Sequence, residues 1–209
     1  MSDAALRALR GGRIVAVATE SFLGLLGDAT LPGALDVLFS LKPRGADKGV
    51  GLLLPDRAAW APLCVAVPPL AQRLADALWP GPLSIALAAR AGVDARLLLD
   101  GRISVRLPGD SPAADLARAF GRPLSATSAN LPGAPAATRS EAVRASFADA
   151  VRDGRLLVVD GSSPGGAPST VVVVDGEAAS IVRDGAVPRS VLAGILGASL
   201  RPLGPADRR

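Results

Sequence analysis

Apolar positions along the chain follow two spacings, one typical of helices and one typical of strands. In residues 2–10, Leu6 and Leu9 stand three apart ahead of a Gly-Gly pair, which predicts a short amphipathic helix. The next apolar run, residues 13–18, is short and β-branched, so it predicts a buried strand. The later predicted helices are residues 31–42, 67–81, 111–121, 140–151 and 188–196. The later predicted strands are residues 51–56, 82–89, 102–108, 123–127, 155–160, 169–175 and 179–185.

This order of elements predicts one α/β domain with an open, twisted, mixed sheet flanked by helices. Strands separated by helices favour parallel pairs, whereas the closely spaced late strands favour antiparallel pairs. No segment has the composition of an interdomain linker. We therefore expect residues 1–198 to form the domain and residues 199–209 to form a flexible tail.

The composition is that of a soluble globular protein, with 49% hydrophobic and 20% charged residues among 209. No apolar run approaches the roughly 18 residues of a membrane-spanning helix. The first residues contain an early Asp and several arginines, which is not the layout of a secretory signal. A cytoplasmic location is expected.

Two residue types are missing, and their absence excludes several kinds of active site. The chain has no histidine and no tyrosine, and Cys64 is its one cysteine. A Ser-His-Asp triad, a Cys-His pair, a histidine zinc site and an internal disulfide are therefore excluded. Any chemistry must come from lysine, arginine, carboxylates, hydroxyls, backbone amides or a bound metal ion.

The formal net charge of +4 favours polyanionic partners, either nucleotide phosphates or nucleic acid. Aromatic residues make up only 3% of the chain, which disfavours a stacking platform for single-stranded bases. A modest positive charge is also common in proteins without such partners, so charge alone does not decide the function.

The segment SLKPRGADKGV, residues 40–50, holds both lysines of the chain, Lys42 and Lys48, although lysine and arginine together number 23. It connects a predicted helix to a predicted strand. With Arg44, these lysines could neutralise a triphosphate or a small planar anion such as bicarbonate. The alternative is a solvated charged loop, but the confinement of lysine to this segment favours an anion site, where an ammonium group fits and a guanidinium does not.

The segment PLSATSANLPG, residues 123–133, is a predicted strand that runs into a polar turn at a sheet edge, where α/β proteins bind ligands. Ser128 and Asn130 could donate to phosphate or carboxylate oxygens. The alternative is an ordinary turn in which both side chains bond their own backbone.

Ser169 and Thr170 stand at the start of a very apolar strand, after a glycine-rich approach that lets the backbone come near a ligand. The segment is not a P-loop, because the Lys-Ser/Thr ending is missing. Arg106 and Arg183 lie in or at the end of apolar strands, where an unpaired charge is costly. Their partners are either structural carboxylates or the carboxylate or phosphate of a substrate.

Seven short motifs follow one another between about residues 12 and 187: VATESFLGLLGDA, LKPRGADKGV, WPGPLSIAL, SVRLP, SATSANLPG, PSTVVVVD and IVRDG. In this order they resemble the YrdC/TsaC family of threonylcarbamoyl-AMP synthases, in its short single-domain form. The resemblance implies a YrdC-like fold with a concave basic groove. Each motif is weak alone, but seven in the family's order are hard to obtain by chance.

The resemblance implies a reaction that joins L-threonine, bicarbonate and ATP into L-threonylcarbamoyladenylate and releases pyrophosphate. The product would pass to a threonylcarbamoyl transferase complex that modifies the adenosine beside the tRNA anticodon. Mg²⁺ is expected on the ATP phosphates, and no metal site made of side chains is expected. Transfer RNA, or double-stranded RNA more generally, is a further expected partner.

The resemblance also implies roles for individual residues. Lys42 and Arg44 are the expected catalytic residues, which with Lys48 hold the ATP phosphates and bicarbonate. Thr19 and Arg106 would receive threonine, with Ser169 lining the same side. Ser128 and Asn130 would bind nucleotide phosphates, and Arg183 would clamp ATP. Leu23 stands where the family usually has an aromatic residue, a change expected to affect the threonine pocket.

Two other functions fit parts of the same pattern. One is a non-catalytic YrdC-like paralogue that binds RNA through its arginines, which the two retained lysines disfavour. The other is a carbamoyl-transfer domain like those of hydrogenase maturation proteins, which usually accompany zinc-finger and acylphosphatase-like segments that this chain lacks.

Overall fold

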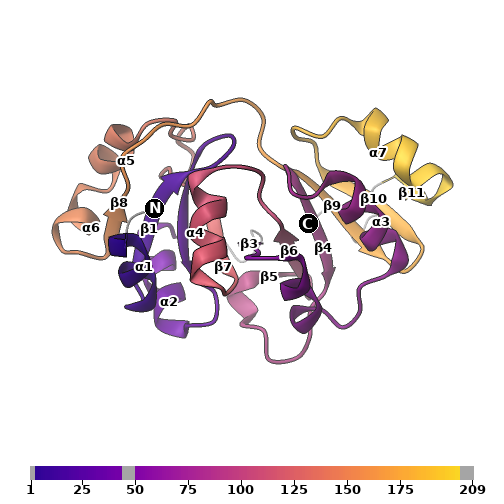
Figure 1. Ribbon diagram of the computed structural model, residues 1–209, viewed down its shortest axis with the longest axis horizontal. Helices are drawn as coiled ribbons and strands as arrows, with labels where there is room; N and C mark the ends of the chain where they lie inside the picture. Colours follow the sequence, from indigo (N-terminus) through magenta and orange to yellow (C-terminus); the bar gives the residue numbers. More distant parts are fainter. Residues whose placement is uncertain (1–2, 44–49, 203–209) are drawn as a thin grey trace.

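The computed structural model describes residues 3–43 and 50–202, which contain the helices and strands shown in Figure 1. The helices are α1 (Asp3–Arg10), α2 (Pro32–Leu41), α3 (Pro69–Leu78), α4 (Pro112–Phe120), α5 (Ser140–Ser146), α6 (Ala148–Arg152) and α7 (Arg189–Leu196). The strands are β1 (Ile14–Ala18), β2 (Leu23–Asp28), β3 (Gly51–Leu53), β4 (Leu83–Ala88), β5 (Leu98–Leu99), β6 (Arg102–Arg106), β7 (Leu124–Ser128), β8 (Leu156–Val158), β9 (Thr170–Asp175), β10 (Ala178–Arg183) and β11 (Leu200–Arg201). Three short 3₁₀ helices are η1 (Arg57–Leu63), η2 (Ala95–Leu97) and η3 (Gly197–Ser199).

The strands form one mixed sheet in the order β11-β10-β9-β4-β6-β3-β7-β2-β1-β8, and β5 pairs with β6. Parallel pairs join β1 to β8, β3 to β6, β4 to β9 and β10 to β11. The late strands β9 and β10 form an antiparallel pair, as their close spacing predicts. The prediction of a single α/β domain with a mixed sheet flanked by helices is confirmed.

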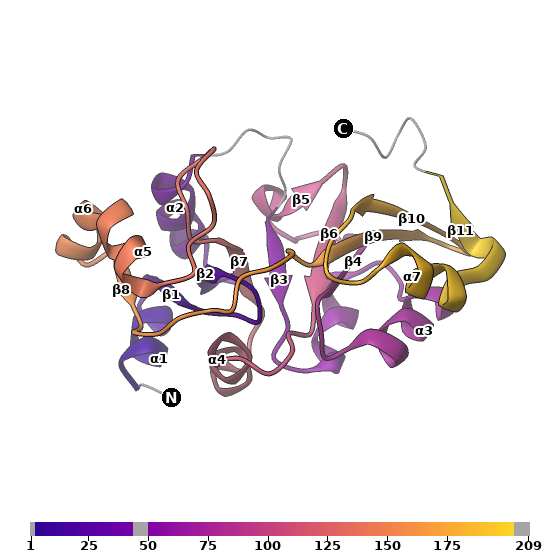
Figure 2. The ribbon, with the colours of Figure 1, turned by 90° about the horizontal axis from the view of Figure 1, so that it is seen from above.

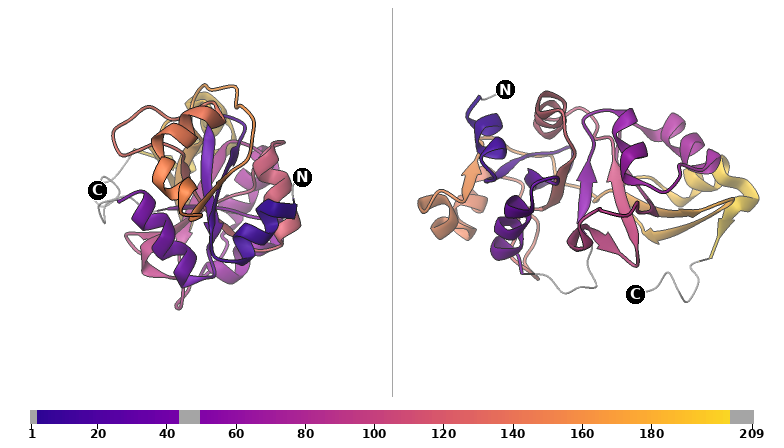
Figure 3. Two further views of the ribbon diagram at one scale, coloured as in Figure 1. Left: turned by 90° about the vertical axis from the view of Figure 1, so that its left-hand side faces the viewer. Right: turned by 90° about the horizontal axis from the view of Figure 1, so that it is seen from below.

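Strand β1 is buried on both faces because its side chains alternate between two apolar layers. Ile14 and Ala16 belong to a layer shared with α2, α5 and α6, whereas Val15 and Val17 pack with α1 and α4. Figure 3 shows helices on both sides of the sheet at this end of the molecule.

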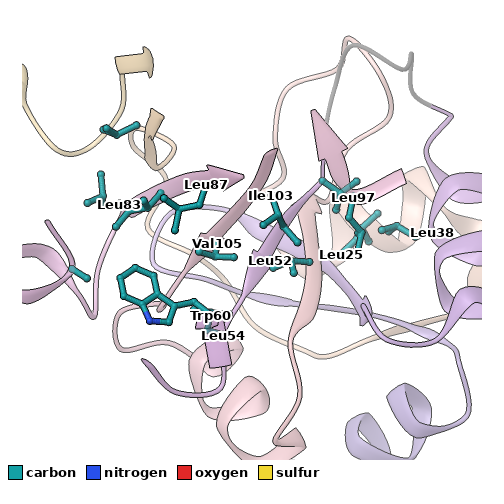
Figure 4. Close-up of a cluster of buried hydrophobic side chains, with 14 of the residues drawn as sticks. Leu25, Leu38, Leu52, Leu54, Trp60, Leu83, Leu87, Leu97, Ile103 and Val105 are labelled. Carbon is teal, nitrogen blue, oxygen red and sulfur yellow. The ribbon is translucent and has the colours of Figure 1, made fainter. Parts of the chain in front are cut away.

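The other half of the sheet is covered on one face only. In β6 the apolar residues Ile103 and Val105 are fully buried, and Figure 4 shows them in one cluster with Leu83, Leu87 and Trp60. Helices α3 and α7 lie on the same side of β4, β9 and β10 (Figure 2). The alternate residues of these strands face the opposite side, which no helix among the described residues covers.

A long connection, residues 159–169, joins β8 at one edge of the sheet to β9 in the other half, and Figure 1 shows it running along the molecule. It is fixed part-way by Gly165, whose backbone N–H donates to the carbonyl oxygen of Ser21 at 2.7 Å. Below, we call residues 159–169 the strap. It brings Pro168 and Ser169 to the open face of the sheet.

Three predictions differ from the structure. Strand β2 was not predicted, because burial of all six residues removes the alternation that marks a half-buried strand, and Gly24 and Gly27 weaken the strand signal. The predicted helix 140–151 is interrupted at Phe147, whose φ and ψ of −122° and 33° are not helical. The predicted tail starts too early, since Leu200 and Arg201 pair with β10. No helix in the described ranges is long and apolar enough to cross a bilayer.

Candidate functional site

The open face of the sheet forms the floor of a cleft of about 780 Å³. Small residues line this floor from several strands: Gly24, Gly51, Ser84, Ala86 and Ser104. In β4 and β6 the large apolar side chains point to the opposite face, into the core, whereas in β9 Val171 and Val173 line the cleft. The floor of the cleft at β4 and β6 is therefore a consequence of the alternation along these strands, with small or polar side chains toward the cleft and large apolar ones toward the helices.

Five of the predicted site residues line this cleft, although they come from five separate segments of the chain. They are Thr19, Arg106, Ser128, Ser169 and Arg183. Arg44 and Lys48 lie outside the described residues. The remaining two, Lys42 and Asn130, are connected to the cleft through Ser128.

Arg106, at the end of β6, forms an ion pair with Glu20 from the loop between β1 and β2. Nη1 of Arg106 donates to Oε1 of Glu20 at 2.8 Å, and the two side chains are 12% and 18% exposed. The same oxygen accepts the backbone N–H of Gly109 at 3.1 Å. Burial lowers the pKa of the Arg106 guanidinium, and the charge of Glu20 opposes that shift. Of the two partners expected for Arg106, the structure shows the carboxylate of the protein itself.

Ser169 and Arg183 meet beside Ser84 of β4, the strand next to β6. Nη2 of Arg183 donates to the carbonyl oxygen of Ser169 at 2.8 Å and to its hydroxyl at 2.9 Å. The hydroxyl of Ser84 lies 3.1 Å from that of Ser169. The sheet register explains the arrangement, since Ser84 pairs with Val171 and Val171 pairs with Arg183 on adjacent strands. Two hydroxyls and a guanidinium therefore share one edge of the cleft, a set that can bind an anion.

Gly185, two residues after Arg183, lies against the backbone of the strap, where a side chain would not fit. A Cβ at this position would lie 2.3 Å from the carbonyl oxygen of Pro168 and 2.5 Å from the carbonyl carbon of Ser169. Ala186 donates its N–H to the same Pro168 oxygen at 2.8 Å. The strap can approach β10 this closely only where no side chain intervenes.

Lys42 is buried behind the cleft and does not line it. Its ammonium group donates to the carbonyl oxygen of Ser128 at 2.7 Å, to the Ser128 hydroxyl at 3.1 Å and to Oδ1 of Asn130 at 2.8 Å. Lys42 is 7% exposed. These contacts fix the turn after β7, so in this structure Lys42 holds the Ser128–Asn130 turn at the side of the cleft.

Thr19 also lines the cleft, and its hydroxyl is engaged in its own turn. Oγ1 donates to the carbonyl oxygen of Phe22 at 2.7 Å and accepts the N–H of Ser21 at 3.2 Å. The turn keeps Thr19, Ser21 and Phe22 together at the cleft wall.

Comparison with known proteins shows which family the chain belongs to. The family model of Sua5, YciO and YrdC, described as "Telomere recombination", matches residues 7–185. The chain belongs to the Sua5/YciO/YrdC family. A threonylcarbamoyl-AMP synthase of Idiomarina loihiensis is 36% identical over 176 residues, which cover 82% of this chain and 91% of that protein. A threonylcarbamoyl-AMP synthase of Stenotrophomonas maltophilia is 35% identical over 181 residues, which cover 81% and 91%.

Solved structures of the family share the fold. The crystal structure of P. abyssi Sua5 complexed with L-threonine superimposes with a TM-score of 0.84 at 27% sequence identity. The alignment covers 95% of this chain and 58% of the Sua5 chain, so this chain spans little more than half of that relative.

Sequence reasoning did not single out several cleft residues of this family member. Ser84, Arg102 and Ser104 line the cleft, and the alternation in β6 was the signal that could have found the last two. Glu20 gave no signal beyond its place in the TESF turn. Phe22 and Leu23 both line the cleft, so an aromatic ring stands there one residue before Leu23, whose side chain is 1% exposed and also belongs to the core.

Among the described residues, no group of three or more Asp, Glu, Cys or His side chains lies close enough together to hold a metal ion. Within the described part of the chain, Asp100 is the carboxylate that borders the cleft. The polar side chains there are mainly hydroxyls and guanidinium groups, which suit oxyanions.

Proposed function

We propose that this protein is a threonylcarbamoyl-AMP synthase, an ATP-dependent nucleotidyltransferase that condenses L-threonine, bicarbonate and ATP and releases pyrophosphate. One observation carries the proposal. Arg106, Arg183, Ser128, Ser169 and Thr19 line a single cleft of about 780 Å³ in a chain closely related to proteins named for this activity. A volume of this size falls within the range of sites for nucleotide-sized ligands.

The reaction needs no nucleophile from the protein. The amine of threonine attacks bicarbonate, a C–N bond forms and water leaves, giving a carbamate. A carbamate oxygen then attacks the α-phosphorus of ATP, and the bond to the bridging oxygen of the β-phosphate breaks to release pyrophosphate. The protein brings the three reactants together and stabilises the charge that develops on the phosphate oxygens. This suits a site without histidine, tyrosine or an accessible cysteine.

The geometry supports a division of roles along the cleft. Arg106, held by Glu20, would bind the threonine carboxylate beside Thr19, and Ser169 would line the same side. Arg183, which donates to Ser169, would bind phosphate oxygens of ATP. The turn at Ser128, which Lys42 holds in place, would contact the nucleotide.

Arg44 and Lys48 are proposed, with Lys42, to bind phosphate and bicarbonate, although both lie outside the described residues. Mg²⁺ would neutralise charge on the ATP phosphates. Since the polar side chains of the described cleft are mainly hydroxyls and guanidinium groups, the ion would be held by the phosphates and not by a set of protein carboxylates. The product would be consumed by a threonylcarbamoyl transferase acting on tRNA in the cytoplasm.

The test is pyrophosphate release from ATP, measured with and without L-threonine and with and without bicarbonate. We expect release to require both. The Arg106→Ala variant should lose it, whereas Asp76→Asn, which removes an exposed ion pair between Arg57 and Asp76 on the surface of α3, should keep it. Pyrophosphate release that is independent of threonine would refute the proposal. Tight RNA binding without turnover would instead support the RNA-binding paralogue.

A further inference from the structure

The ion pair between Glu20 and Arg106 connects two parts of the sheet that are not neighbours. Glu20 follows β1 and precedes β2, and Arg106 ends β6. In the sheet order β6-β3-β7-β2, two strands lie between them. The ion pair therefore joins the loop that carries Thr19 to the strand that carries Arg106, across β3 and β7.

Glu20 acts from behind the cleft. Its neighbours Thr19, Ser21 and Phe22 line the cleft, but Glu20 does not. Its contacts are instead with Arg106 and with the backbone N–H of Gly109, in the loop between β6 and α4. Oε1 accepts both hydrogen bonds, and Oε2 is buried without a hydrogen-bond partner among the described residues.

This arrangement engages Nη1 of the Arg106 guanidinium and leaves its other N–H groups without a contact to Glu20. A guanidinium is planar, so a hydrogen bond at one nitrogen constrains the directions of the other N–H groups. We propose that Glu20 is a positioning residue for amino-acid binding, which acts by holding Arg106 and the Thr19 loop at a set separation. The proposal rests on the proposed function, since it assigns Arg106 to the carboxylate of the amino acid.

Substitutions of Glu20 can separate the effect of side-chain length from the effect of charge. Glutamine keeps the length of the side chain and an oxygen that can accept from both Arg106 and Gly109, but it has no charge. Aspartate keeps the charge but is one methylene shorter, so it cannot reach both donors from the same backbone. If Glu20 acts by positioning Arg106, the Gln variant, which keeps the length, should bind threonine better than the Asp variant. If Glu20 only balances the charge of Arg106, the Asp variant should bind better than the Gln variant.

The experiment measures L-threonine binding by calorimetry and the KM values for L-threonine and ATP from pyrophosphate release, with the full chain and its Glu20→Gln, Glu20→Asp and Glu20→Ala variants. We expect Glu20→Asp and Glu20→Ala to weaken threonine binding by about tenfold or more, because a hydrogen bond to a charged group is typically worth at least that factor. Glu20→Gln should stay within about fivefold of the parent protein, and the KM for ATP should change less than about threefold in all three.

Asp76→Asn serves as the matched control, because it also removes a carboxylate from an arginine, but at the surface of α3. Binding by Glu20→Asp equal to that of the parent, together with loss in Glu20→Gln, would overturn the positioning role. Equal binding by all variants would overturn it as well. If Glu20→Ala does not fold, comparing threonine binding by Glu20→Gln with that by Glu20→Asp still tests the positioning role. A parent protein that binds no threonine and releases no pyrophosphate contradicts the proposed function instead.

Discussion

Lys42 shows why one position in this chain keeps a lysine where arginine is used almost everywhere else. Its ammonium group, 7% exposed, donates to three oxygens of the Ser128–Asn130 turn. An ammonium offers three donors around one small nitrogen, whereas a guanidinium is larger and its donors lie in one plane. Lys42→Arg keeps the charge but should lose this fit.

The size of the effect follows from the contacts. At least one of the three acceptors would lose its donor, which costs about 1–3 kcal/mol when the acceptor is buried. Forcing a larger head group into a packed site adds about 1–3 kcal/mol. We therefore expect Lys42→Arg to lower the free energy of unfolding by about 2–6 kcal/mol. For a chain of about this length, that corresponds to a decrease in Tm of roughly 4–24 °C.

The same contacts change the expectation for Lys42→Ala. From the sequence alone, loss of turnover with an intact fold is the natural prediction for an anion-binding lysine. Because Lys42 also holds the turn that carries Ser128, the alanine variant should lose stability together with activity.

The assay is urea unfolding followed by tryptophan fluorescence, combined with pyrophosphate release at a temperature where each variant is folded. Arg73→Lys is the control, because it exchanges the same two residue types in the opposite direction at an exposed position of α3. It should change the free energy of unfolding by less than about 0.5 kcal/mol. If Lys42→Arg unfolds within that margin of the parent and turns over at the normal rate, the explanation for the retained lysine is refuted.

Three further predictions concern the cleft and the core. Gly185→Ala should displace the strap at Ser169, lowering both stability and turnover, and parent-like values of both would contradict the close approach. Ser104→Leu should fill the cleft and abolish turnover with little change in stability, whereas its neighbour Ile103→Ala should cost about 2–5 kcal/mol by urea unfolding, since Ile103 is fully buried. Burial raises the pKa of the Cys64 thiol to about 11, so the folded protein should resist thiol labelling at pH 8. The folded protein keeps the proton on Cys64 up to a higher pH than the unfolded chain does. The free energy of unfolding should therefore decrease from about pH 9 toward pH 11, and it should decrease less in Cys64→Ala.

The sequence was most informative where one strand alternates between two environments. Along β6 the alternation of Ile103 and Val105 with polar residues predicts one buried and one open face, which the structure confirms. It was least informative where contacts join distant segments. Arg106 needs a partner because it lies in an apolar strand, but nothing local shows that the partner is Glu20, 86 residues earlier. Such pairs depend on the order of strands in the sheet, which local patterns do not determine.

The contacts of Lys42 likewise could not be predicted from local sequence patterns. Its type and its segment indicate an anion site, and only the fold shows that its three acceptors come from a turn 86 residues later. Leu23 stands where an aromatic residue is usual in the family, and Phe22, one residue earlier, lines the cleft beside it. Which side chains of a turn face a cleft depends on the fold and cannot be read from composition.

The position of β9 has a consequence for synthesis on the ribosome. Strand β9 lies inside the sheet, between β10 and β4, yet it is among the last segments of the chain to be made. Until residues 170–175 emerge, the apolar strand β4 has no neighbour on the side where β9 will pair. Its free backbone N–H and C=O groups on that side can pair with other nascent chains. Truncations that end before residue 170 should therefore aggregate during expression, while those that end after β11 should accumulate as monodisperse protein.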